Sequence, residues 1–115
     1  MSTERIRNTL RQLAARVREI AENPVMDERR RLWYGFNSLK PERPMVLCFP
    51  EESWRELLPE SELTIEEEPY RSWELKLRRS IYWWEHINDD NVLEKWFDIP
   101  WEVTVGDFGI HVEKK

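Results

Sequence analysis

The feature that most constrains the fold is the order of two short apolar stretches and the segment between them. Residues 45–49 read Met-Val-Leu-Cys-Phe, and residues 91–97 read Asn-Val-Leu-Glu-Lys-Trp-Phe. A long segment of helical character separates them, which gives the order strand, crossover helix, strand. Because this connection is too long for a hairpin, the two strands are predicted to pair in parallel with both faces covered. Two strands do not close a barrel, so we interpret the chain as the opening portion of a larger unit.

Length and composition are those of a single soluble domain. The 115 residues are 40% hydrophobic and 36% charged, and no apolar run approaches the roughly 20 residues that span a bilayer. The first residues lack the apolar core of a secretion signal. Cys48 is the only cysteine, so an internal disulfide is excluded and a cytoplasmic location is expected.

Charge is unevenly distributed along the chain. Residues 1–43 carry ten Lys/Arg against six Asp/Glu, whereas residues 44–70 carry one arginine against eight glutamates. A basic N-terminal region can bind nucleic acid, but here the arginines alternate with apolar residues at helical spacing, which favours a solvated helix. We therefore expect neither nucleic acid nor a membrane as a partner.

The clearest helix covers residues 3–22. Its apolar positions follow a 4-3-4-3 spacing: Ile6, Leu10, Leu13, Val17 and Ile20. Ser2 is suited to cap its start, and Asn23-Pro24 ends it. This narrow stripe would pack either on the body of the domain or against a second copy of the chain, and the sequence leaves both readings open.

Further helices are expected later in the chain. One begins at Asp27 as N-cap and runs to Leu39, a short one follows Pro50, and the longest begins at Pro69 and ends at the polar group 88–91. After Pro100, apolar and polar residues alternate over 101–105 and 108–113, which predicts a β-hairpin with a turn at Gly106-Asp107. The predicted fold class is therefore α/β. A single domain would cover residues 1–115, with an N-terminal helix over 1–25 and an α/β unit over 26–115.

Two residues stand out as candidates for chemistry. Asp98 follows the second predicted strand, and α/β proteins place reactive groups at the C-terminal ends of their strands. It would act there as a base or cation stabiliser, or else cap the turn at Pro100. His86 lies near a helix end and would serve as a proton donor or a ligand, or simply pack and hydrogen-bond. His111 on the polar side of the hairpin and Cys48 in a buried strand rank lower. Arg71, Arg78 and Arg79 share one helix and would hold an anion or pair with glutamates.

Several stretches of the sequence resemble the uroporphyrinogen decarboxylase-like proteins. Residues 43–49 and 54–60 are similar to the first strand and following turn of that family, residues 77–80 and 96–99 to its next helix and second strand, and residues 109–112 to the segment after it. The similarity spans about residues 26–113 and is nearest to the corrinoid-methyltransferase-like branch.

This resemblance implies a (β/α)8 barrel with Asp98 at or near the family's active-site aspartate. It implies no cofactor in this chain, but a zinc ion and a corrinoid partner in a full-length methyltransferase-like parent. The decarboxylases carry an arginine-rich loop after the first strand, and residues 50–54 are acidic instead, so porphyrinogen binding is not expected.

Two functions follow as hypotheses. The first is an N-terminal fragment of a uroporphyrinogen decarboxylase/methyltransferase-like protein, not catalytic by itself. That fragment would associate through its exposed sheet edges. The second is a small interaction module, in which helix 3–22 and the tryptophans, seven in the sequence, form a dimer or partner surface. A small enzyme using Asp98 and His86 ranks behind both, because few polar groups converge.

Overall fold

The computed structural model describes residues 2–110 and 113, and within these residues the chain forms helices and connecting segments but no β-strand. The helices are α1 (Thr3–Ala21), α2 (Val25–Asn37), α3 (Trp54–Leu57) and α4 (Tyr70–Tyr82), with 3-10 turns at Glu51–Ser53 (η1) and Glu60–Glu62 (η2) and a π-helical turn at Trp83–Ile87 (η3). None of the helices in the described part is long and apolar enough to cross a membrane.

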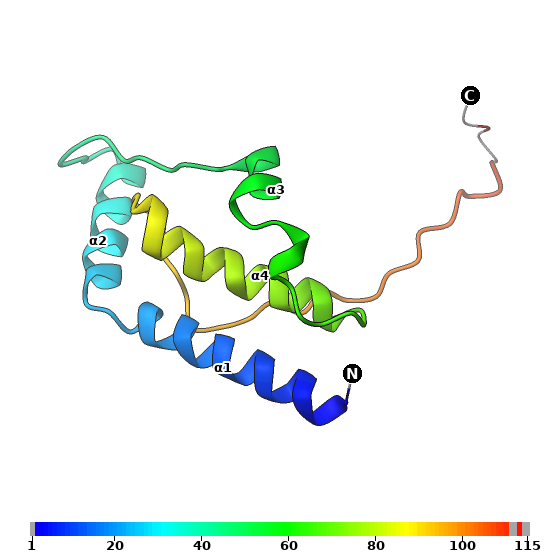
Figure 1. The fold of residues 1–115 in the computed structure, drawn as a ribbon. Helices are drawn as coiled ribbons and strands as arrows, with labels where there is room; N and C mark the ends of the chain where they lie inside the picture. The colour runs from blue at the N-terminus through cyan, green and yellow to red at the C-terminus, as the bar shows by residue number, and fades with distance from the viewer. Residues whose placement is uncertain (1, 111–112, 114–115) are drawn as a thin grey trace.

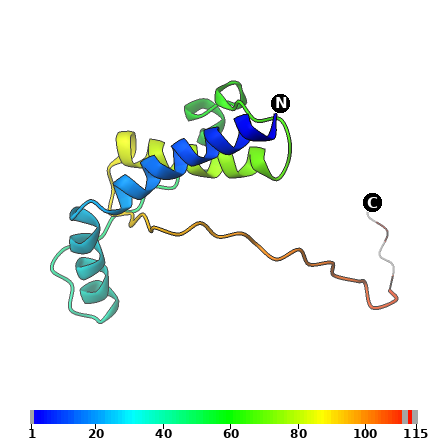
Figure 2. The same cartoon turned by 90° about the horizontal axis from the view of Figure 1, so that it is seen from below.

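Helices α1 and α4 lie side by side and form the body of the molecule (Figure 1). They run in the same direction, since Arg16 near the end of α1 pairs with Glu85 just after α4 at 3.1 Å. Helix α2 turns away from this pair, and α3 with its flanking turns lies along the other side of α4. The chain after residue 97 leaves the body as an extended segment (Figures 1 and 2).

Helix α1 forms as its sequence predicts. The Ser2 side chain accepts a hydrogen bond from the backbone N–H of Arg5 at 3.2 Å, which satisfies one of the free donors at the helix start. Ile6, Val17 and Ile20 are buried against the body, and Leu10 is half-buried. Its end lies one residue before the predicted one.

Helix α2 begins three residues earlier than predicted, with Pro24 and not Asp27 at the N-cap position. Asp27 lies in its first turn instead of capping it, and the Asn23 side chain accepts from the backbone N–H of Val25 at 3.0 Å. Leu32 is buried as expected, whereas Phe36 and Leu39 near the end of the predicted apolar face are exposed. The fully buried side chains of the helix therefore lie within its first eight residues.

A buried carboxylate attaches the acidic loop, residues 60–68, to α4. Glu74 is 0% exposed and accepts hydrogen bonds from the backbone N–H groups of Thr64 and Ile65, at 2.8 and 2.9 Å, and from the guanidinium of Arg78 at 3.1 Å. Burial alone would raise the pKa of Glu74, but these donors outweigh it and keep the pKa below its ordinary value. The ionised side chain thereby holds Ile65, which is itself fully buried, against the helix.

The core formed by this arrangement is small. Among the described residues, nine apolar side chains are buried, most of them from α1, the start of α2 and α4. The radius of gyration is 18.3 Å, whereas a compact domain of this length has about 13 Å. Much of the chain therefore lies outside a common core.

The α/β prediction is wrong for the described residues, and so is the expected barrel fragment. Residues 45–49 are extended, but the backbone N–H groups of Val46 and Cys48 donate to the carboxylates of Asp90 and Asp89 instead of to a neighbouring strand. Residues 91–97 form no strand either, and the backbone N–H of Leu93 points at the sulfur of Met26. In residues 45–49, aspartate side chains therefore accept the backbone hydrogen bonds that a neighbouring strand was predicted to accept.

The C-terminal hairpin is likewise absent from the described residues. Residues 101–105 are extended and exposed, and no backbone hydrogen bond links them to another described segment. A tight turn does form, but at Phe108-Gly109, both with positive φ, closed by Ile110 N–H to Asp107 C=O at 3.0 Å. The predicted turn at Gly106-Asp107 was therefore displaced by two residues. Part of the second predicted strand, 111–112, lies outside the described residues.

Replacing the buried carboxylate tests its role in the fold. Glu74→Gln keeps the side-chain volume but turns one acceptor into a donor that faces backbone N–H groups, so we expect the free energy of unfolding to fall by roughly 2–4 kcal/mol. Urea denaturation followed by circular dichroism measures this. Glu66→Gln, an exposed glutamate of the same loop, is the matched control; equal stabilities of the two variants would contradict the assignment.

Candidate functional site

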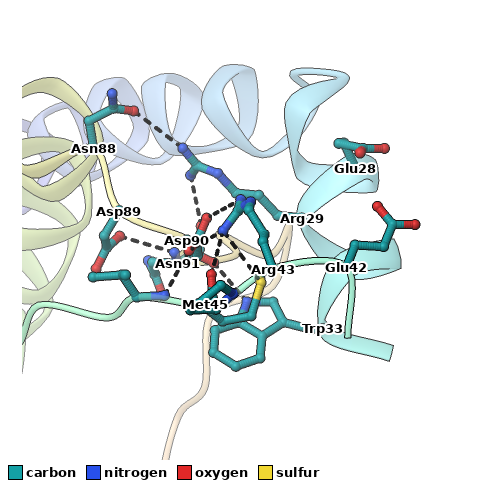
Figure 3. A network of polar contacts seen from close by, with 12 residues as sticks. Glu28, Arg29, Trp33, Glu42, Arg43, Met45, Asn88, Asp89, Asp90 and Asn91 are labelled. Atoms are coloured by element: carbon teal, nitrogen blue, oxygen red, sulfur yellow. Dashed lines mark hydrogen bonds and ion pairs between the residues drawn. The ribbon is translucent and has the colours of Figure 1, made fainter. Parts of the chain in front are cut away.

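The densest group of polar contacts surrounds residues 88–91, Asn-Asp-Asp-Asn, which we call the 88–91 junction (Figure 3). Asn88 adopts the left-handed conformation, with φ 51° and ψ 53°, and ends the helical run of α4 and η3. Asparagine tolerates this conformation better than most residues, so the sequence fixes where the chain turns. The predicted end of the long helix at this polar group is confirmed.

Asp90 joins the junction to α2 and to the segment after it. Its carboxylate accepts two hydrogen bonds from the Arg43 guanidinium, at 2.8 and 3.0 Å, and one from the backbone N–H of Val46 at 2.7 Å. The side-chain hydrogen bond from Arg43 is the main cause that lowers the pKa of Asp90. Its carbonyl oxygen accepts from the Trp33 indole N–H at 2.8 Å, and its own N–H donates to the Val46 carbonyl.

Asp89 joins the junction to η3. One carboxylate oxygen accepts from the Trp83 indole N–H at 2.8 Å and from the backbone N–H of Asn91 at 3.0 Å, and the other accepts from Cys48 N–H at 2.8 Å. Arg29, buried on α2, donates to the carbonyl of Asn91 at 2.8 Å and lies 5.3 Å from the Trp84 ring centre. Every carboxylate oxygen of the two aspartates thus has a donor from the same chain. The junction therefore connects α2, residues 43–48 and η3 to one another.

The two residues predicted for chemistry lie apart from this junction and from each other. Asp98 is exposed, and its backbone carbonyl accepts from Lys76 on α4 at 3.4 Å. His86 is exposed in η3 and stacks on Tyr82 with ring centres 4.4 Å apart. Ten helical positions separate Lys76 from His86, roughly 15 Å along the axis, so the two candidates do not share a site. The positional argument for Asp98 required a strand that the described residues do not form.

The lower-ranked candidates also lie apart. Cys48 is exposed, so the prediction that it is buried in a strand was wrong. His111 lies outside the described residues. Arg78 pairs with Glu74, Arg71 donates to the carbonyl of Ile65 at 2.9 Å, and Arg79 lies over the Trp54 ring. These arginines therefore pack within the fold.

An apolar depression, the α1/α4 groove, lies between the first halves of the two helices and has a volume of about 450 Å³. It is lined by apolar side chains from three segments: Ile6, Leu10 and Ala14, Trp73 and Leu77, and Phe97. Arg7 and Arg11 also line it, and in the part of the chain that the structure describes neither forms an ion pair. The groove combines apolar walls with positive charge.

The second unusual surface is the C-terminal segment, residues 98–110. Trp101 is 92% exposed and Phe108 is 97% exposed, and Val103 and Val105 are also mostly exposed. The segment begins beside the groove, because Phe97 packs edge-to-face on Trp73 at 5.9 Å and under the ammonium of Lys76 at 4.7 Å. Such a concentration of exposed apolar side chains is typical of an interaction surface.

No group of three or more His, Cys, Asp or Glu residues able to hold a metal ion occurs among residues 2–110 and 113.

No protein-family model matches the chain, and neither a curated protein nor a solved structure shows significant similarity to it.

Sequence reasoning missed the structural role of Asp89 and Asp90, since it treated residues 88–91 only as a helix terminator. The available signal was their position: two adjacent carboxylates follow a long helix, while arginines and tryptophans that would need partners lie earlier in the chain. Sequence reasoning also missed Glu74, which lies a few residues after the acidic loop. The available signal was its position on the side of α4 that carries the buried Leu77.

Substitution at the junction separates Asp90 from Asp98. Asp90→Asn loses the two-oxygen contact with Arg43, and we expect the free energy of unfolding to fall by roughly 1–3 kcal/mol. Asp98→Asn alters an exposed side chain whose backbone makes the contact to Lys76, so a change within about 0.5 kcal/mol is expected. Urea denaturation compares the two; a larger effect at Asp98 than at Asp90 would refute this account.

Proposed function

We propose that this chain is a protein-association module, a small helical body whose exposed apolar surfaces are covered by another polypeptide when it works. The α1/α4 groove and the C-terminal segment are the two docking elements. The observation that carries the proposal is the exposure of Trp101, at 92%, within an extended segment that alternates apolar and polar residues.

Energetics supports this reading. Fully burying one large apolar side chain contributes roughly 1.5–3 kcal/mol, and the C-terminal segment exposes six of them: Ile99, Trp101, Val103, Val105, Phe108 and Ile110. The free energy that these side chains would contribute on burial is not gained within this chain, and a partner that covers them would gain it. Residues 101–105 are extended, and no backbone hydrogen bond links them to another described segment. This matches a common mode of recognition, in which an extended segment orders against a partner.

The chemistry of the remaining groups supports a non-catalytic role. The aspartates of the 88–91 junction and Glu74 receive hydrogen bonds from the chain itself, and Asp98 and His86 lie apart on the surface. General acid–base catalysis needs such groups within hydrogen-bond reach of one substrate. The proposed setting is the cytoplasm, on the ground of the single cysteine in the sequence.

The resemblance to the uroporphyrinogen decarboxylase-like proteins supplies a second candidate. In this form of the proposal the chain is the non-catalytic N-terminal part of a larger protein of that superfamily, and the covering polypeptide is the rest of the same protein. Zinc and a corrinoid partner would then concern that remainder and not this chain. The exposed C-terminal segment favours it, and the reading frame beyond the codon of Lys115 decides it.

A photo-crosslinking residue placed at position 103 tests the association role without knowing the partner. In cells that express the natural protein, we expect an adduct with a polypeptide when the photo-crosslinker replaces Val103, because this position lies at the docking surface. The readout is the shifted band on a denaturing gel and its identification by mass spectrometry.

The matched control carries the same photo-crosslinker at Gln12, an exposed position on the opposite side of α1 from the groove. An adduct at both positions with equal yield, or at neither, would refute the proposed docking surface. An adduct within the same chain, from position 103 to its own body, would also count against it.

A further inference from the structure

We propose that the partner is a second copy of this chain, and that the C-terminal segment of each copy lies in the α1/α4 groove of the other. This inference rests on the proposed function and names its partner. Both complementary surfaces are present in one molecule, so two copies can exchange them reciprocally about a twofold axis.

The dimensions of the two surfaces match. Along α1 the groove extends from Thr3 to Ala14, which is roughly 16 Å at the rise of a helix. In an extended chain Trp101, Val103 and Val105 share one side and span roughly 13 Å. All three apolar side chains can therefore face the groove at once, and the indole is the natural anchor beside Leu10 and Leu77.

The charges of the two surfaces are opposite. Arg7 and Arg11 line the groove without an ion pair in the described part of the chain. The C-terminal segment carries Asp98, Glu102 and Asp107, and no Lys or Arg occurs between positions 98 and 113. In the extended segment Glu102 alternates with Trp101 and Val103, so it points away from the floor of the groove and meets the arginines at its rim. Attraction between these opposite charges favours this pairing over other apolar contacts.

The start of the C-terminal segment directs it away from its own groove. Phe97 is fixed between Trp73 and Lys76, and the carbonyl of Asp98 is held by Lys76. Ile99 precedes a proline, which restricts it to extended angles and disfavours a reversal at this point. The segment accordingly runs outward from the body (Figures 1 and 2), where another copy can receive it.

The first test is the mass of the purified chain in solution. Sedimentation equilibrium from low micromolar to several hundred micromolar protein should show a monomer–dimer transition that weakens at high salt, because part of the attraction is electrostatic. Trp101→Ser, which changes an exposed residue outside the core, should weaken dimerisation by roughly tenfold or more, with an unchanged helical signal.

Charge reversal provides a test that loss of folding cannot imitate. Arg7→Glu with Arg11→Glu, and separately Asp98→Lys with Glu102→Lys, should each weaken dimerisation roughly tenfold. An equimolar mixture of these two double variants, or the combined fourfold variant, should recover dimerisation at least in part. Arg5→Glu, on the other side of α1, is the control and should leave the dimer intact.

Three outcomes would overturn the inference: a monomer at every concentration, a dimer that Trp101→Ser leaves unchanged, or charge-reversed variants that do not recover when combined. The proposed association role is judged separately. If position 103 still forms an adduct with a different polypeptide while the purified chain stays monomeric, the second-copy inference fails and the association role stands.

Discussion

Two adjacent aspartates, Asp89 and Asp90, connect three parts of the chain: α2, residues 43–48 and η3. Asp89 and Asp90 accept hydrogen bonds from the indole N–H of Trp83, the guanidinium of Arg43 and the backbone of residues 46–48. A carboxylate has two oxygens and about four acceptor positions, so one side chain can bind several donors at once. In a chain without a sheet among its described residues, these acceptors satisfy backbone groups that a neighbouring strand would otherwise satisfy.

Glu74 applies the same solution at another place. The acidic loop, residues 60–68, has few apolar side chains to bury, because five of its nine residues are glutamates. One carboxylate facing inward accepts from two consecutive backbone N–H groups and from Arg78, and so fixes the loop. Ionised side chains therefore organise a chain whose apolar core is small, and the fold depends on their staying charged.

The sequence predicted the helices better than the segments between them. The 4-3-4-3 spacing from Ile6 to Ile20 and the capping residue Ser2 located α1 almost to the residue, because the helix makes its own backbone hydrogen bonds. The apolar stretches 45–49 and 91–97 were misread as strands, since periodicity says nothing about which partner a strand has. Whether such a stretch joins a β-ladder depends on distant residues. Here the backbone N–H groups of residues 46 and 48 donate to the side chains of Asp90 and Asp89 instead. The candidate chemistry of Asp98 was inferred from the strand and lost its basis with it, whereas the groove could not be foreseen because it requires the placement of α1 beside α4.

The parallel arrangement of α1 and α4 has a consequence for how the molecule forms. Its contacts join residues far apart, such as Arg16 and Glu85, which are 69 positions apart in sequence. Two helices that run the same way cannot zip together from a short turn as a helical hairpin does. The whole intervening chain must be closed first, at an entropic cost that short-range contacts avoid. During synthesis the apolar side of α1 therefore leaves the ribosome with no partner and waits in water, or with a chaperone, until α4 and the turn after it have emerged.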